Sequence, residues 1–384
     1  MHIKNRNLFR VARVILLKLP LLYKFFAKFR TSQKRLLIIK TDAIGDYILF
    51  RNFIEIVMKS ERFKDYRVDL LGNELWREIA LQYDGDYINE FLFIKADELY
   101  ESPLKIFKLG WQLFKNNYET VLQPTFARTF INDGLAALTA AKQIVGFEGD
   151  TERIAIRYKS QTDRFYTKRL ILPPNTNFEF EKVKFFFEIL LKSPIVINEP
   201  FIKLKERKTR EGIVICPGAG IFKRSWESQK FLDLIKLILQ HTKQPVYLTG
   251  GYGDIKTGDF LKNNLPPGSV NNLIGCTSLP ELIELIGSAA LVIANETSAI
   301  HIAAATKTNT ICILGGGHFG RFAPYPEYMD LKPLCLYEKM DCYHCNWICS
   351  FKTREDEPYP CISAISVQKV WSSVLPLLSN IVTT

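Results

Sequence analysis

The chain has 384 residues, more than one hydrophobic core usually covers, so we expect two domains. Hydrophobic residues make up 47% of the sequence, which is ample for burial, and no internal repeat or low-complexity tract is visible. The net charge is +11, but residues 1–41 hold eleven Lys and Arg without any Asp or Glu, while the remainder holds 40 residues of each sign. Because the body of the chain is neutral, the composition argues against nucleic-acid binding.

The first segment, residues 1–33, is predicted to be a basic amphipathic arm. Lys18, Lys24 and Lys28 interrupt its apolar run, so it is too highly charged to cross a membrane, and no signal-peptide cleavage site follows. Interleaved cations and aromatic rings suit the surface of an anionic membrane, which we expect residues 1–41 to bind. The alternative is a helix that packs on the first domain.

Residues 34–195 are the predicted first domain, in which short apolar strands alternate with helices as in α/β folds with parallel sheets. Its first strand opens into the loop 41–46, and a helix is expected over residues 47–58. Residues 193–200 contain two prolines and are the expected linker to the second domain. The strands of the first domain are expected at residues 35–40, 67–71, 91–94, 120–122 and 143–146.

Residues 196–366 are the predicted second domain, with the same alternation of strands and helices. A Pro-Gly loop that contains Gly218 follows its first strand, and Lys223 and Arg224 stand just before a helix. A glycine turn after the second strand carries Asp254, whose carboxylate is able to reach a ribose hydroxyl. The strands of this domain are expected at residues 212–216, 245–248, 291–294 and 310–314.

The most informative segment is residues 291–325. An apolar run ends in a polar turn with Glu296, a helix of small residues carries His301 on its first turn, and a second apolar run opens into three glycines. In a parallel sheet covered on both faces, such a turn lies at the carboxyl end of a strand and at the start of a helix, where ligands bind. The free backbone N–H groups expected at this helix start suit a phosphate; they belong to Thr297, Ser298 and Ala299.

Together these motifs resemble glycosyltransferase family 9, the ADP-heptose:lipopolysaccharide heptosyltransferases, over residues 35–370. That family carries Asn-Asp-Thr-Gly, a nearby His and an Arg-Phe-x-Pro-Tyr run. Here His301 and residues 321–325 match, whereas Glu296 replaces the Asp and Ser298 replaces the Gly. The family also has a Gly-Asp pair after its first strand and a cation two residues before a Trp. These features correspond to Gly45, Asp46 and Arg224, with Asp42 matching a second, less constant carboxylate.

The resemblance implies a GT-B architecture, in which two doubly wound, Rossmann-like parallel-sheet domains face a cleft. It implies that the second domain holds the nucleotide sugar and that the first domain holds the acceptor. Asp46 would then be the general base of an inverting glycosyltransferase. Lys223 or Arg224, together with the helix start at 297–299, would hold the diphosphate, and His301 would orient that turn or the sugar.

The expected donor is ADP-heptose, and no cofactor or catalytic metal is required. The expected acceptor is a lipid-linked saccharide, such as a lipopolysaccharide core. The protein would therefore be cytoplasmic and peripheral to the inner membrane. Two alternatives stay open: a sugar-nucleotide epimerase on the same fold, and a catalytically inactive saccharide-binding protein at the membrane surface.

The last part of the chain combines a cysteine cluster with a final helix, residues 367–384, that is able to cross back to the first domain. The spacing of Cys342, Cys345, Cys349 and Cys361 could build a tetrahedral thiolate site with His344 as a spare ligand, although free thiols are the leading interpretation. Residues 315–320 read G-x-G-x-x-G but precede no helix-forming run, so they are weak evidence for a dinucleotide site.

Overall fold

The computed structural model describes residues 4–31, 33–205, 210–330 and 332–382. The chain divides into two compact units: Met1–Thr176 with Phe180–Val196, and Asn177–Glu179 with Ile197–Thr384. The main division, after Val196, falls inside the linker predicted at residues 193–200.

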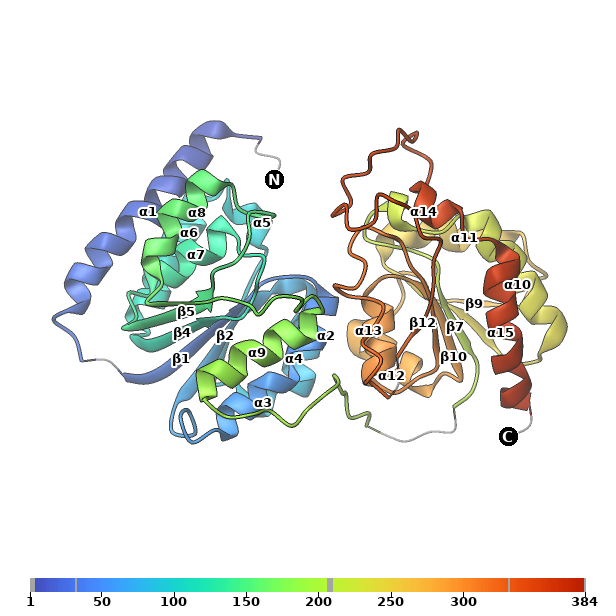
Figure 1. The fold of residues 1–384 in the computed structure, drawn as a ribbon, viewed down its shortest axis with the longest axis horizontal. Helices are drawn as coiled ribbons and strands as arrows, with labels where there is room; N and C mark the ends of the chain where they lie inside the picture. Colours follow the sequence, from blue (N-terminus) through green and yellow to red (C-terminus); the bar gives the residue numbers. More distant parts are fainter. Residues whose placement is uncertain (1–3, 32, 206–209, 331, 383–384) are drawn as a thin grey trace. The chain divides into compact units, whose positions relative to one another are not determined.

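The first unit is built on a six-stranded, entirely parallel sheet with the strand order β3-β2-β1-β4-β5-β6. Its central strands bury almost every side chain, because helices cover both faces of the sheet (Figure 1). The strands are β1 (Gln33–Lys40), β2 (Arg67–Asn73), β3 (Glu90–Ile94), β4 (Tyr118–Gln123), β5 (Gln143–Phe147) and β6 (Lys168–Leu170).

Two layers of helices enclose this sheet (Figure 1). One layer contains α1 (Arg6–Ala27), α6 (Pro103–Lys115), α7 (Phe130–Leu138) and α8 (Ile156–Thr162), with the short α5 (Ala96–Leu99) beside α6. The other contains α2 (Ile44–Phe50), α3 (Asn52–Lys59), α4 (Arg77–Tyr83) and α9 (Glu179–Leu191). The single helix expected over residues 47–58 is thus two helices that meet at Arg51.

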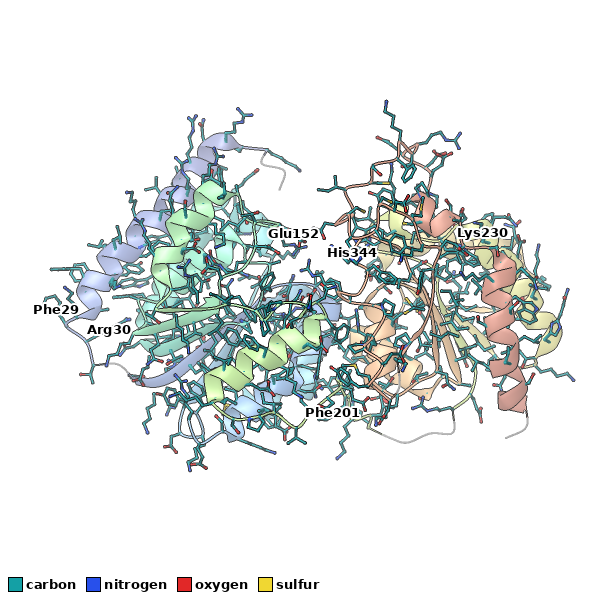
Figure 2. All side chains as sticks on the ribbon, viewed as in Figure 1. Phe29, Arg30, Glu152, Phe201, Lys230 and His344 are labelled. Carbon is teal, nitrogen blue, oxygen red and sulfur yellow. The ribbon has the colours of Figure 1, made fainter. Side chains whose placement is uncertain are left out.

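The N-terminal helix α1 is part of the first unit, in agreement with the alternative stated for the arm. It packs on α6 and α7 and places Phe9, Ala12, Leu16 and Tyr23 in their core. Its opposite side is exposed and apolar, and Phe29, just beyond the helix, is 77% exposed and points away from the fold (Figure 2). No helix among the described residues is long and apolar enough to cross a membrane.

The second unit repeats the plan with a parallel sheet of strand order β12-β11-β10-β7-β8-β9. The α/β prediction of two doubly wound parallel sheets is therefore confirmed. The strands are β7 (Ile213–Cys216), β8 (Val246–Leu248), β9 (Asn271–Asn272), β10 (Leu291–Asn295), β11 (Thr310–Ile313) and β12 (Leu334–Leu336).

Helices again lie on both faces of this sheet (Figure 1). On one face, α12 (Leu279–Ser288) lies beside α13 (Ser298–Ala305); α12 begins in a capping box formed by Ser278 and Glu281. The other face carries α10 (Ser228–His241), α11 (Ile255–Asn263), α14 (Pro360–Ser363) and α15 (Val367–Val382).

The C-terminal helix α15 packs against α10, and its Val370, Val374 and Leu378 join the core of the second unit. This packing assigns α15 to the second unit, and the crossing back to the first domain considered from the sequence stays a prediction.

Candidate functional site

In the second sheet, β10 and β7 lie side by side although they are far apart in the chain. From β7 the chain adds strands toward one edge of the sheet, and from β10 it adds them toward the other edge, so the strand order reverses between these two strands. Ligands of open α/β sheets bind at the carboxyl ends of the strands at such a switch point. Asn295, the last residue of β10, ties the two following loops together there. Its Nδ2 donates to the backbone oxygens of Pro217 (2.8 Å) and Gly218 (3.1 Å), and its Oδ1 accepts from the Trp226 amide at 3.0 Å.

This bridge brings Arg224 from one loop close to Glu296 from the other. Their side chains approach to 3.9 Å between Arg224 Nη2 and Glu296 Oε2, and Glu296 is only 7% exposed. Within the part of the chain that the structure describes, Arg224 Nε and both Glu296 carboxylate oxygens are buried without a hydrogen-bond partner. Buried polar groups are normally paired, so this arrangement is suited to a ligand that supplies the missing partners.

Burial also changes the acid–base chemistry of the pair. Desolvation raises the pKa of Glu296 to about 7, although the nearby Arg224 opposes the shift. Desolvation also lowers the pKa of Arg224, which stays a cation at neutral pH. The site therefore combines a fixed positive charge with a carboxyl group that is partly protonated near neutral pH.

The two cations predicted for this loop have different partners. The Arg224 guanidinium lies 4.2 Å from the ring centre of Trp347, a cation–π contact that holds it beside Glu296. The Lys223 ammonium donates instead to Thr353 Oγ1 at 3.0 Å and lies above the ring of Tyr359. The structure thus places Arg224 at the switch point and uses Lys223 to anchor the C-terminal segment.

The start of α13 lies directly beside this pair. Thr297 is the N-cap residue of α13, and its Oγ1 accepts from the Ala299 amide at 3.4 Å. The Ala299 amide is therefore engaged by its own cap in this structure, and the binding of a phosphate at this helix start stays a prediction. Ser298, which replaces the family's Gly, is half-buried in the first turn.

His301 is buried in α13, and its Nδ1 lies 2.8 Å from the Tyr325 hydroxyl. Burial lowers the pKa of His301 to about 4, so the ring is neutral at physiological pH. Its partner Tyr325 belongs to the run 321–325 that the sequence singled out. The histidine thus links α13 to this loop and is not suited to act as a proton donor near neutral pH.

Gly218 and Asp254 are brought into contact on the other side of the switch point. A Cβ at Gly218 would lie about 2.1 Å from the Asp254 carboxyl group, so only glycine fits there. The Gly251 amide donates to Asp254 Oδ2 at 2.9 Å, and burial raises the pKa of this carboxyl group. Asp254 therefore caps its own turn, and its predicted contact with a ribose hydroxyl stays a prediction.

The first unit has its own site at the carboxyl end of β1. Asp42 follows β1, and its Oδ2 accepts from the buried Lys40 (2.8 Å) and from Thr125 (3.0 Å). Gly45 and Asp46 lie in the first turn of α2, where the helix dipole stabilises a carboxylate. The N-cap residue of α2 is Ala43, so Asp46 does not serve as the side-chain cap.

The four tail cysteines Cys342, Cys345, Cys349 and Cys361 line one small cavity, and all of them are free thiols. In the described ranges of the chain, no group of three or more His, Cys, Asp or Glu is arranged to hold a metal ion. The segment that carries Cys342, Cys345 and Cys349 packs against the loop of residues 315–317, because the amides of His344 and Asn346 donate to Gly316 O (2.8 Å) and Gly317 O (2.9 Å). Side chains of Tyr343 and Trp347 occupy the space that a Cβ at Gly316 or Gly317 would need, so these glycines accommodate the tail.

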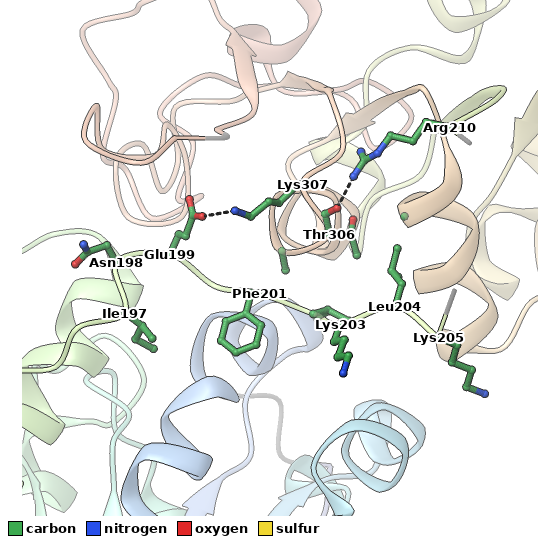
Figure 3. A pocket seen from close by; sticks show the side chains of 13 residues that line it. Ile197, Asn198, Glu199, Phe201, Lys203, Leu204, Lys205, Arg210, Thr306 and Lys307 are labelled. Carbon is green, nitrogen blue, oxygen red and sulfur yellow. Dashed lines mark hydrogen bonds and ion pairs between the residues drawn. The ribbon is translucent and has the colours of Figure 1, made fainter. Parts of the chain in front are cut away.

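A larger cavity of about 960 Å³ lies elsewhere in the second unit, beside residues 197–205 (Figure 3). Lys307 pairs with Glu199 at 3.2 Å across it, and Arg210 donates to Thr306 O at 2.8 Å. Because Thr306 and Lys307 follow the C-terminal end of α13, this cavity is remote from the strand ends that carry the predicted site residues.

Sequence reasoning missed two residues that organise the switch point. Asn295 precedes Glu296 in the polar turn, but its three hydrogen bonds to the loop after β7 became visible only with the register of β7 and β10. Trp347 lies more than a hundred residues from Arg224 in the chain, so no local pattern indicated their contact.

Comparisons with known proteins identify the family and the fold. The profile of glycosyltransferase family 9 (heptosyltransferase) matches residues 106–345. Lipopolysaccharide heptosyltransferase 1 of Campylobacter coli is 23% identical over 310 residues, which cover 73% of this chain and 84% of that protein. The structure of E. coli ADP-heptose LPS heptosyltransferase II aligns with a TM-score of 0.68 at 16% identity, over 90% of this chain and 99% of that one. E. coli heptosyltransferase WaaC with ADP-2-deoxy-2-fluoro heptose aligns with a TM-score of 0.64 at 14% identity, over 89% and 99% of the two chains.

Proposed function

We propose a specific reaction for this chain, which belongs to glycosyltransferase family 9, the heptosyltransferases. It transfers heptose from ADP-heptose, with inversion, to a hydroxyl group of a lipid-linked saccharide such as a lipopolysaccharide core. The donor binds at the switch point of the second unit, and the acceptor binds in the first unit. The choice of donor is supported by the structure of WaaC, which has the same fold and was determined with ADP-2-deoxy-2-fluoro heptose.

The single observation that carries the proposal is the incompletely paired couple Arg224 and Glu296. A diphosphate would accept from the unpartnered Arg224 Nε, and a sugar hydroxyl would donate to a Glu296 oxygen. As the bond between the sugar and the diphosphate breaks, negative charge grows on the leaving ADP. A buried guanidinium stabilises that charge more strongly than the flexible, solvated ammonium of a lysine.

Asp46 is the proposed general base on the acceptor side. It takes the proton from the attacking hydroxyl, whose oxygen bonds to the anomeric carbon from the face opposite the diphosphate. The electron pair of the broken bond leaves with ADP, so the configuration at the anomeric carbon is inverted. His301 stays neutral in this scheme and positions the α13 turn through Tyr325.

The exposed side of α1 is the proposed contact with an anionic membrane surface. Phe25, Phe26 and Phe29 form an exposed aromatic group there, with ring centres 5.5 and 5.7 Å apart, and Lys24 and Lys28 lie among them. The aromatic rings would enter the headgroup region and the lysines would contact anionic lipids. This attachment would bring the enzyme to an acceptor that is linked to a membrane lipid.

Calorimetry with ADP tests the donor site. Arg224→Ala should weaken ADP binding by roughly 1.5–3 kcal/mol, the value of a charge-assisted hydrogen bond. Lys223→Ala is the matched control, because it removes a neighbouring cation whose ammonium is bound to Thr353. Equal ADP affinity in the Arg224→Ala variant and the wild type would contradict the assignment of the diphosphate site.

A further inference from the structure

The segment of residues 337–359 connects β12 to α14 and packs on the loop that carries the cations of the second unit. The Tyr359 amide donates to Lys223 O at 2.8 Å, and Thr353 Oγ1 accepts from the Lys223 ammonium at 3.0 Å. Two further amides of the segment donate to the loop of residues 315–317. The loop before α10 is therefore held from outside by a part of the chain that lies more than a hundred residues later.

Trp347, in the middle of this segment, adopts an unfavourable conformation. Its backbone φ is 62°, in the left-handed region that a bulky side chain seldom occupies. Its Nε1 is buried without a hydrogen-bond partner in the part of the chain that the structure describes, although a buried indole N–H is usually paired. Such features persist only where the surroundings enforce them, and they are concentrated at functional sites.

The ring of Trp347 is fixed on several sides. The ring of Tyr359 stacks on it, with centres 5.8 Å apart and planes inclined by 26°. A Cβ at Gly315 or Gly317 would lie 2.6 Å or 2.2 Å from atoms of the ring, so these glycines allow it to approach the loop after β11. The ring centre lies 4.2 Å from the Arg224 guanidinium, well inside the range of a cation–π contact.

We infer that Trp347 is a positioning residue, which holds the Arg224 guanidinium in the orientation in which it donates to the diphosphate. A long side chain without such a contact samples several rotamers and loses that freedom when the ligand binds. With the guanidinium already fixed by the ring, ADP binding avoids this loss. Glu296 does not fix it in the same way, because its carboxylate approaches only to 3.9 Å. The inference rests on the proposed function and adds to that site a residue outside its motifs.

Calorimetry with ADP on the full chain tests this role. Trp347→Leu should weaken ADP binding by roughly fivefold to thirtyfold, the factor that corresponds to a desolvated cation–π contact. Trp347→Phe keeps a ring face and should recover most of the lost affinity. Trp371→Leu is the matched control, because it removes another Trp of the second unit, buried on α15, and should leave ADP affinity unchanged. Wild-type affinity in Trp347→Leu, or equal weakening in the Leu and Phe variants, would overturn the inference.

A double-mutant cycle separates positioning from a general loss of packing. In the Arg224→Ala background no guanidinium is left to position, so adding Trp347→Leu should weaken ADP binding by less than about twofold more. A further loss as large as that in the wild-type background would overturn the inference. If Arg224→Ala alone binds ADP as the wild type does, the proposed diphosphate site fails. If Arg224→Ala binds weakly and Trp347→Leu binds normally, the positioning role alone fails.

A second variant covers the case in which Trp347→Leu fails to fold. Gly317→Ala keeps the indole but places a methyl group 2.2 Å from it, so the ring must shift away from its present position. This variant should weaken ADP binding in the same direction as Trp347→Leu, and unchanged affinity would overturn the inference.

Discussion

At the scale of single residues, the site depends on two buried charges that only partly satisfy each other. Arg224 and Glu296 approach to 3.9 Å, longer than a hydrogen bond, and Arg224 Nε and both Glu296 oxygens are buried without a partner among the described residues. Such a pair is costly in an empty site, because desolvation is not fully offset by mutual attraction. The cost is consistent with a binding site whose ligand completes the hydrogen bonds.

The replacement Glu296→Gln should therefore stabilise the protein, more strongly at high pH. The pKa of Glu296 is raised from 4.5 to about 7 in the fold, so its penalty is absent below pH 4.5, grows between pH 4.5 and 7, and is complete above pH 7. The shift corresponds to roughly 3 kcal/mol at most. Urea unfolding should show the variant gaining stability over the wild type at pH 8 and little difference at pH 4.5. An equal difference at both pH values would mean that the carboxyl group titrates normally.

Part of this residue-level picture was predictable from sequence. Local motifs placed Arg224, Glu296 and Thr297 at strand ends and helix starts, and the parallel strand order brings those ends together. The separate roles of Lys223 and Arg224 were not predictable. They depend on Thr353 and Trp347, which belong to a tail that follows no periodic pattern.

At the scale of elements, α1 has two apolar sides with different surroundings. One side fills the core against α6 and α7, and the other is exposed with cations interspersed. The excess of cations in residues 1–41 is also smaller at the surface than composition suggests, because Arg35 pairs with Asp69 and Lys40 with Asp42. Sequence alone could not divide these roles, since both sides of the helix are apolar.

Removing a core contact of α1 should therefore destabilise the first unit. Leu16 is fully buried and packs tightly against Gly134 of α7, so Leu16→Ala should cost about 2–5 kcal/mol. Leu21→Ala, on the exposed side, is the matched control and should change stability by less than about 0.5 kcal/mol. Equal denaturation midpoints for Leu16→Ala and the wild type would show that α1 is not part of the core.

The exposed side of α1 should govern attachment to vesicles. The full chain should sediment with vesicles of anionic lipid and be released by high salt, because salt screens the lysines. A variant with Phe25, Phe26 and Phe29 all changed to Ser should lose most of this binding and keep its stability. Phe107→Ser on α6, also at an exposed ring, is the control. Undiminished binding of the triple variant would place the membrane contact elsewhere.

The strands that are short apolar runs were predictable, whereas β6, β9 and β12 were not expected from the sequence and one helix was not divided correctly. The break between α2 and α3 at Arg51 coincides with contacts that lie far along the chain. The guanidinium pairs with Asp84 at 2.8 Å and donates to Tyr83 O at 3.1 Å, which helical periodicity in residues 47–58 cannot reveal.

At the scale of the whole molecule, each unit has its own core and its own switch point. The second unit presents a buried cation and a helix start, whereas the first presents Asp42, with a carboxylate oxygen that lacks a partner in the described chain, and carries Asp46 in the first turn of α2. This division is consistent with the proposed two-substrate reaction, in which the leaving diphosphate needs a cation and the hydroxyl nucleophile needs a base.

The most direct test of the central claim is acceptor-dependent release of ADP from ADP-heptose by the wild type and by Asp46→Asn. The wild type should release ADP and extend the lipid-linked saccharide by one heptose, detected by mass spectrometry. Asp46→Asn should keep its ADP affinity and lose roughly 10²–10⁴-fold in turnover, the usual contribution of a general base. Full turnover in the Asn variant, or consumption of ADP-heptose by the wild type without any acceptor, would contradict the account.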